Sequence, residues 1–205
     1  MRIRITFSKT GALRYIGHLD LNTIWERAAR RAGLPLAYSQ GFHPQPKMTF
    51  ASALPLGFSS RCEVMDMRFN QEIDLTSLSV QLQDVMPSGI GILKVENIDE
   101  LAPQLQMQIL SAEYEVTLTE AVDASELKRK IDEIMASPSL PRERRGKSYD
   151  LRPLIEKLDL TSENKILMQL AAREGATGRP EEVLDVLGIM IESARVERTN
   201  LIFRN

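Results

Sequence analysis

Residues 2–8 alternate strictly between polar and apolar side chains, and this pattern restricts the start of the chain to one structure. Ile3, Ile5 and Phe7 point to one side of an extended backbone, and the residues between them point to the other. A period of two is typical of a β-strand that is buried on one face. The chain therefore begins with a half-buried strand, whose apolar face needs helices to cover it.

The rest of the first half continues with alternating helix and strand patterns. Leu21, Trp25 and Ala28 share the apolar face of a helix expected over residues 18–32, and Gly33 is placed to end it. Further strands are expected at 36–39, 48–53, 63–69 and 90–95, and a second helix at 75–85. The resulting main order of strand, helix, strand, strand, helix, strand predicts a ferredoxin-like unit, a four-stranded antiparallel sheet with helices on one face.

The second half repeats this order more loosely. Strands are expected at 113–119, 166–171 and 195–203, and helices at 125–135 and from Pro180 to Gly188. Residues 138–149 are expected to form a basic, hairpin-like segment. We therefore expect an α+β chain of two tandem ferredoxin-like units. The first covers residues 1–98 and contains a Gly/Pro loop at 39–57, and the second covers 107–205 and contains a basic segment at 142–152. Residues 99–106 are the expected linker.

Cysteine and histidine usage limits the chemistry of the chain. The single cysteine, Cys62, excludes an internal disulfide and fits a reducing, cytoplasmic compartment. Two separated histidines and one cysteine provide no metal-ligand spacing, so no metal and no cofactor are expected in this chain. No apolar run approaches the about 18 residues of a membrane span. We expect no membrane association.

The net charge of −2 conceals a strong asymmetry along the chain. Residues 1–61 carry nine Lys and Arg against two acids, whereas residues 62–138 carry five against fifteen. Blocks of one sign in a nearly neutral protein indicate a surface that faces a partner. Chance clustering on a solvated face is the alternative.

The stretch from Arg14 to Lys47 holds the first group of candidate binding residues. It contains both histidines and a Gly/Pro-rich loop without apolar periodicity, which is typical of a shaped surface. Lys47 and backbone amides near Gly41 suit a phosphate, and an exposed Phe42 suits a stacked base. Alternatively, His18 caps a helix and Phe42 fills a small satellite core. The candidates are Arg14, His18, Gln40, Phe42, His43 and Lys47.

The second group lies in the basic segment, whose cations surround Gly146. Cations at this density resemble a mobile arm that neutralises phosphates, although a plain solvated turn has the same composition. No nucleotide-binding or nucleophile motif is present, and Asp66 and Asp150 look like isolated acids. We therefore predict no catalytic residue. The candidates are Arg142, Arg144, Arg145, Lys147 and Arg152.

Six segments of the chain carry distinctive motifs, at residues 14–20, 39–47, 54–57, 112–114, 149–155 and 179–184. Together they resemble the radical-SAM-linked protein family, a domain of unknown function that is free-standing or fused behind a radical SAM, cobalamin-binding-like protein. Gly17 and His43 depart from the family, which often has Ser and Asn there, and the second departure weakens a catalytic role for His43. The resemblance implies a radical SAM partner, because one cysteine cannot supply a three-cysteine iron–sulfur site.

The leading expectation is a non-catalytic RNA-binding or substrate-presenting accessory module that works with a radical SAM protein. A protein-interaction scaffold, whose acidic middle block meets a basic partner or another copy, is the first alternative. The second is a metal-independent endoribonuclease that uses His18 or His43 as general base and Lys47 or Arg14 to stabilise the oxyanion. The sequence does not specify the RNA, the partner's reaction or the oligomeric state.

Overall fold

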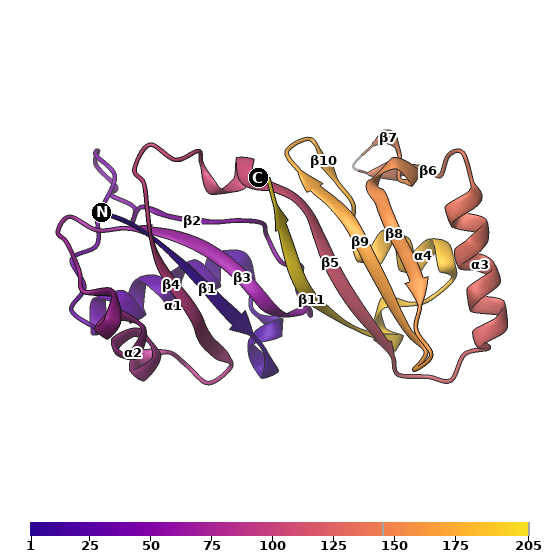
Figure 1. Cartoon of the computed structure of the whole chain (residues 1–205), viewed down its shortest axis with the longest axis horizontal. Coiled ribbons are helices and arrows are strands. Elements are labelled where there is room, and N and C mark those ends of the chain that lie inside the picture. Colours follow the sequence, from indigo (N-terminus) through magenta and orange to yellow (C-terminus); the bar gives the residue numbers. More distant parts are fainter. Residues whose placement is uncertain (145, 205) are drawn as a thin grey trace. The chain divides into compact units, whose positions relative to one another are not determined.

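The computed structural model describes residues 1–144 and 146–204, and the chain divides into two compact units, Met1–Gln108 and Ile109–Asn205 (Figure 1). Each unit combines an antiparallel sheet with α-helices. The expected mixed α+β class is therefore confirmed. None of the described helices is long and apolar enough to cross a membrane.

The first unit follows the expected sequence of elements. Its members are β1 (Arg2–Lys9), the 3-10 helix η1 (Gly11–Tyr15), α1 (His18–Arg31), β2 (Met48–Phe50), β3 (Ser59–Arg68), α2 (Leu75–Val85), β4 (Ile90–Ile98) and the 3-10 helix η2 (Leu105–Gln108). β1 pairs with β3 on one side and with β4 on the other, and β2 pairs with β3. All these pairs are antiparallel, and the strand order is β4–β1–β3–β2.

The register places the charged residues of β1 and β3 opposite one another. Arg4 lies across from Asp66 and Ile5 across from Met65. Because side chains alternate between the faces of a strand, the apolar residues share one face and the charged residues the other. The sheet therefore has one apolar face and one charged face.

The apolar face forms the core beneath α1 and α2. Ile3, Ile5 and Phe7 pack with Trp25 of α1 and Leu82 of α2, and all five are fully buried. The Phe7 and Trp25 rings meet edge to face, with centroids 4.8 Å apart. The expected burial of the Leu21, Trp25 and Ala28 face is confirmed.

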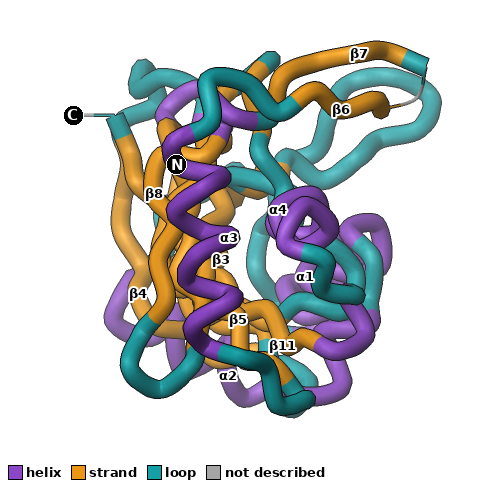
Figure 2. The backbone as a smooth tube through the Cα atoms, turned by 90° about the vertical axis from the view of Figure 1, so that its right-hand side faces the viewer, coloured by secondary structure: helices purple, strands orange, loops and turns teal. Residues whose placement is uncertain are grey.

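The second unit contains more strands than the sequence predicted. Its members are β5 (Ile109–Leu118), α3 (Ala124–Ala136), β6 (Pro141–Arg144), β7 (Lys147–Asp150), the 3-10 helix η3 (Arg152–Leu154), β8 (Ile155–Leu160), β9 (Lys165–Arg173), β10 (Ala176–Thr177), α4 (Pro180–Leu187), the 3-10 helix η4 (Ile191–Ser193) and β11 (Ala194–Phe203). β5 pairs with β9 and β11, while β8 and β10 both pair with β9. α3 contacts β8 and α4. β6 and β7 form a separate hairpin (Figure 2).

Helix ends agree well with the sequence signals. α4 begins at Pro180, and its C-cap Gly188 is left-handed with φ of 76°, as its position predicted. Asp74 and Asp123 cap α2 and α3 by accepting hydrogen bonds from the first backbone N–H groups. Local sequence chemistry therefore sets where these helices start and stop.

Three expectations differ from the structure. Residues 36–39 form only the single bridges Leu36–Phe69 and Tyr38–Pro46, not a strand, because two prolines flank this stretch. β8 was missed, since an irregular register between Ile155 and Lys157 disturbs its alternation. The expected linker, residues 99–106, belongs to the first unit.

Candidate functional site

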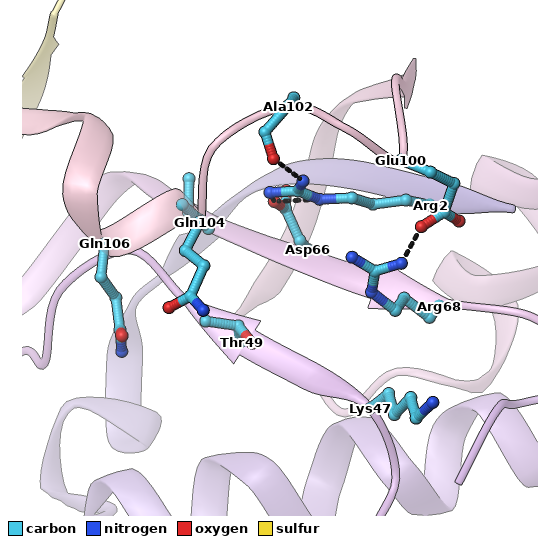
Figure 3. Close-up of a pocket in the computed structure, with 10 residues that line it drawn as sticks. Arg2, Lys47, Thr49, Asp66, Arg68, Glu100, Ala102, Gln104 and Gln106 are labelled. Carbon is cyan, nitrogen blue, oxygen red and sulfur yellow. Dashed lines mark hydrogen bonds and ion pairs between the residues drawn. The ribbon is translucent and has the colours of Figure 1, made fainter. Parts of the chain in front are cut away.

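A pocket opens on the charged face of the first unit's sheet. It has a volume of about 460 Å³, within the range of small-molecule sites. One wall consists of the outward side chains of β1, β2 and β3, and the other is the segment that follows β4 (Figure 3). The side chains that matter most are Arg2, Lys47, Thr49, Asp66, Arg68, Glu100 and Gln104.

Asp66 lies at the centre of a buried charge network in this wall. Arg2 donates to Oδ2 of Asp66 from Nε at 3.0 Å and from Nη2 at 2.7 Å. Arg4 donates to Oδ1 from Nε at 2.8 Å and to Oδ2 from Nη2 at 3.1 Å. The expectation that Asp66 is an isolated acid is therefore wrong. Two arginines on one carboxylate leave the network with a net charge of +1.

Arg2 also holds the opposite wall of the pocket. Its Nη1 donates to the carbonyl of Ala102 at 2.7 Å, and its Nη2 to that of Pro103 at 2.8 Å. Arg4 reaches Gln108 at 3.2 Å. These bonds explain why residues 99–106 lie against the first unit although their sequence lacks apolar periodicity. Arg2 is thus a structural residue whose donors are largely occupied.

Arg68 and Lys47 are the pocket cations closest to solvent. Arg68 forms an ion pair with Glu100, and 39% of the Arg68 side chain and 45% of the Glu100 side chain are exposed. Lys47 is exposed and has no ion-pair partner among residues 1–144 and 146–204. Figure 3 shows Lys47 on the same side of the pocket as Arg68, with no hydrogen bond or ion pair to the other residues drawn. Lys47 and Thr49 share one face because they are two residues apart at the start of β2.

The loop from Ser39 to Lys47 projects beside this pocket. Backbone N–H groups of Ser39 and Lys47 donate to the carbonyls of Gln45 and Ala37, each at 2.8 Å, which closes the base of the loop. Phe42 at its tip is fully exposed, and Gln40 and His43 are exposed as well. The expected alternative that Phe42 fills a satellite core is wrong. The loop presents one aromatic face and, at its base, one cation.

Arg14 and His18 lie at the other end of these elements. The carbonyl of Arg14 accepts from Gly57 N–H at 2.8 Å, and its guanidinium lies over the Tyr15 ring. The His18 ring meets Phe50, at the far end of β2 from Lys47, with centroids 5.1 Å apart. Gly17, not His18, is the N-cap of α1. The first group of candidates is therefore split between two places.

The basic segment forms the expected hairpin, but ion pairs anchor this hairpin, in contrast to the expected mobile arm. Arg142 pairs with Asp185, and Arg144 donates from Nε to Glu182 at 2.8 Å and stacks on Tyr149 at 4.9 Å. The bond to Glu182 raises the pKa of Arg144. Burial, followed by the nearby Glu182, raises the pKa of Tyr149. These arginines thus have acidic partners on α4.

The remaining basic candidates have different surroundings. Arg152 donates to the carbonyls of Ile155 and Met135, each at 2.8 Å, which is a structural role. Asp150, expected to be isolated, accepts N–H groups of Leu140 and Arg152, and these bonds lower its pKa. Lys147 is exposed, and Arg145 lies outside the described residues.

The sequence reasoning missed the pocket residues Arg2, Thr49, Asp66, Arg68 and Gln104. A signal was present, because pairing the strands with their apolar residues on one face brings Arg4 opposite Asp66. Within the described part of the chain, no group of three or more His, Cys, Asp and Glu side chains is placed to hold a metal ion.

The site and fold define a mixed α+β protein with a positively charged pocket on one sheet. Residues 2–180 match the family described as "Uncharacterized protein conserved in bacteria (DUF2344)", and the chain belongs to this family. No curated protein matches the chain in sequence.

Similar solved structures share little sequence with this chain. A protein of the Cbf5-Nop10-Gar1 complex is 9% identical, with a TM-score of 0.47 over 97% of this chain; the chain spans 48% of that protein's length. The small subunit of acetolactate synthase from Thermotoga maritima is 12% identical, with a TM-score of 0.27 over 100% of this chain and 96% of its own. A putative dyp-type peroxidase from Shewanella oneidensis is 10% identical, with a TM-score of 0.24 over 98% and 91%. These scores are too low to support a functional argument.

Proposed function

We propose that this protein is a non-catalytic module that binds single-stranded RNA through the Ser39–Lys47 loop. The observation that carries the proposal is the full exposure of Phe42 on a loop whose base ends in Lys47, a cation without an ion-pair partner among the described residues. An exposed aromatic ring offers a stacking face to any base, and a nearby lysine contacts the backbone phosphate. Gln40 adds donors and an acceptor for a base edge.

The strand orders support a finer description of the fold. The first unit has the order β4–β1–β3–β2, and the second has the matching order β11–β5–β9–β8. We propose that both units are ferredoxin-like, with the β6–β7 hairpin and β10 added to the second. Such units occur in many functions, so the RNA proposal depends on the loop and not on the fold.

The partner in this proposal is a radical SAM protein. It follows from the family resemblance and from the single cysteine, Cys62, which leaves the chemistry to another polypeptide or domain. Copurification of the tagged chain with an iron–sulfur protein from its source cells is the expected result. A chain that recovers no such protein contradicts this part of the proposal.

The RNA proposal is tested by fluorescence anisotropy with a labelled, unstructured RNA 12-mer across a salt series. We expect the logarithm of affinity to fall linearly with the logarithm of salt concentration. Phe42→Ala and Lys47→Ala should each weaken binding by about 1–3 kcal/mol. Met190→Ala, which removes an exposed apolar side chain of the second unit, and Lys94→Ala are the matched controls.

Two outcomes contradict a non-catalytic RNA-binding module, and a third contradicts the loop as its binding site. The first is no binding at low salt, which leaves the protein-interaction scaffold as the explanation. The second is cleavage of the RNA in excess chelator that disappears in His18→Ala or His43→Ala, which would identify a ribonuclease. Binding that is equally strong in both loop variants would move the RNA site elsewhere.

A further inference from the structure

The pocket beside the loop carries an excess of positive charge that the internal ion pairs do not cancel. Three cationic side chains and two carboxylates line it, and the cations are Arg2, Lys47 and Arg68. The carboxylates of Asp66 and Glu100 are both occupied by arginines. The lining side chains therefore carry a net charge of +1, and the Met1 amine beside Glu100 adds one more positive charge. In a chain whose total charge is −2, this pocket attracts anions.

The geometry of the pocket is also fixed by hydrogen bonds of buried residues, which distinguishes it from a cluster of surface charges. Arg2 and Asp66 are 4% and 5% exposed, and Arg2 fastens the wall through the Ala102 and Pro103 carbonyls. Buried charges with several hydrogen bonds hold their geometry well. A ligand thus meets a preformed wall that also carries the solvent-exposed ends of Lys47 and Arg68.

Glu100 occupies the position where an external anion would contact Arg68. Its carboxylate pairs with Arg68 and lies 3.3 Å from the Met1 amine. The backbone around it is held independently, because Leu101 N–H donates to Asp99 and Ala102 is bound by Arg2. The half-exposed Glu100 side chain can therefore swing outward without any change in the wall.

We propose that this pocket binds a phosphate monoester and that Glu100 is an internal anion which the ligand displaces from Arg68. The planar guanidinium of Arg68 suits two phosphate oxygens, Lys47 acts as a point charge, and the Thr49 hydroxyl donates to a third oxygen. The amide of Gln104 faces the same space. The volume of about 460 Å³ accommodates a nucleotide-sized ligand.

A monoester suits this site better than the diester of an RNA backbone. Glu100 carries a single charge and is tethered next to Arg68, so it competes at a high effective concentration. A diester carries the same single charge as Glu100, so it gains less from Lys47 and Arg68 than a monoester does. A monoester carries between one and two charges near neutral pH and gains from both Lys47 and Arg68. The pocket proposal goes beyond the proposed RNA function and does not depend on it, because an RNA end is only one of the molecules that carry a phosphate monoester.

The test measures phosphate binding to the full chain by isothermal titration calorimetry and ³¹P NMR. The probes are inorganic phosphate and a nucleoside 5′-monophosphate, with chloride at equal ionic strength as reference. Lys47→Ala should weaken binding about tenfold or more, the value of one hydrogen bond to a charged group. Glu100→Gln should strengthen binding about two- to fivefold, because it removes an exposed ion pair that competes for Arg68.

The gain of affinity in Glu100→Gln is the decisive result, since a misfolded variant would only lose affinity. The matched controls are Glu96→Gln and Lys94→Ala, which break an exposed lysine–glutamate pair at 2.7 Å on β4. They should leave phosphate binding unchanged. Unchanged or weaker binding by Glu100→Gln, or equal effects of Glu96→Gln, overturns the proposal.

Two RNA probes show whether an RNA end carries the bound phosphate, and they also distinguish the pocket proposal from the RNA-binding proposal. A 12-mer with a 5′-phosphate is compared with the same 12-mer ending in a 5′-hydroxyl. Tighter binding of the first, lost in Lys47→Ala, identifies an RNA end as the carrier. Phe42-dependent binding of both 12-mers, with no phosphate binding, refutes the pocket proposal and leaves the RNA function. Phosphate binding without any RNA binding refutes the RNA function and leaves the pocket as a free-nucleotide site.

Discussion

Arg2 and Asp66 are joined by two hydrogen bonds, of 3.0 and 2.7 Å, although both residues are at least 95% buried. Taking two charges out of water is costly, and the pair repays this cost only because further hydrogen bonds satisfy both groups. Here Arg4 donates a further hydrogen bond to the carboxylate, and two backbone carbonyls accept hydrogen bonds from Arg2. The pair connects the sheet to the wall of the pocket.

Asp66→Asn should therefore strongly destabilise the protein. The change removes the carboxylate charge that pairs with the buried Arg2, and breaking a buried pair in this way costs about 3–5 kcal/mol. The free energy of unfolding is measured by urea denaturation. Glu72→Gln, an exposed acid of the same unit, should remain within about 0.5 kcal/mol of the parent. A loss below about 1 kcal/mol for Asp66→Asn would show that the network contributes little.

Trp25→Ala should cost about 3–5 kcal/mol, because it leaves a large cavity between α1 and the sheet. Trp25 is fully buried, and its Nε1 has no hydrogen-bond partner among the described residues. Trp25→Phe should therefore cost less, since it keeps the ring contact with Phe7 and removes the unpaired N–H. Equal losses for the two variants in a denaturant titration contradict this assignment. Arg27→Ala, on the exposed side of α1, is the control.

Replacing the hairpin arginines should change RNA binding only slightly. Arg142 and Arg144 pair with Asp185 and Glu182, so little net charge is free to neutralise phosphates. The Arg142→Ala, Arg144→Ala double variant should reduce the salt slope by less than about 0.7 per cation. If the salt slope in the anisotropy series falls by the full value of about 0.7 for each arginine, the hairpin is part of the RNA-binding site.

The Leu140–Arg152 turn should weaken in acid through Asp150. Backbone N–H groups hold the pKa of Asp150 below its usual value, so its contribution is fully present above the unfolded pKa of about 3.9. It is lost as the pH falls through the depressed folded value. An NMR titration of the Leu140 and Arg152 amides should show one shared midpoint below the usual Asp range. In Asp150→Asn that transition should be absent.

The sequence alone was sufficient for most helices and strands, although it did not reveal β8 and wrongly predicted a strand at residues 36–39. The alternation in residues 2–8 identified β1, the apolar stripe identified α1, and Pro180 and Gly188 marked the ends of α4. These features depend on neighbouring residues, whose preferences act over one or two turns. The exposure of the Gln40–Lys47 loop was also predicted correctly from its composition.

Only the tertiary structure revealed which charges meet. Asp66 looked isolated because Arg2 lies 64 residues away, and the strand register brings them together. Arg144 and Glu182 are 38 residues apart, and their pairing turns an expected mobile arm into an anchored hairpin. The free energy of an ion pair depends on distance and burial, which are properties of the packed chain and not of local sequence. The strand register and the packing of loops therefore determined which residues form the pocket, whereas composition and periodicity determined the helices and strands that surround it.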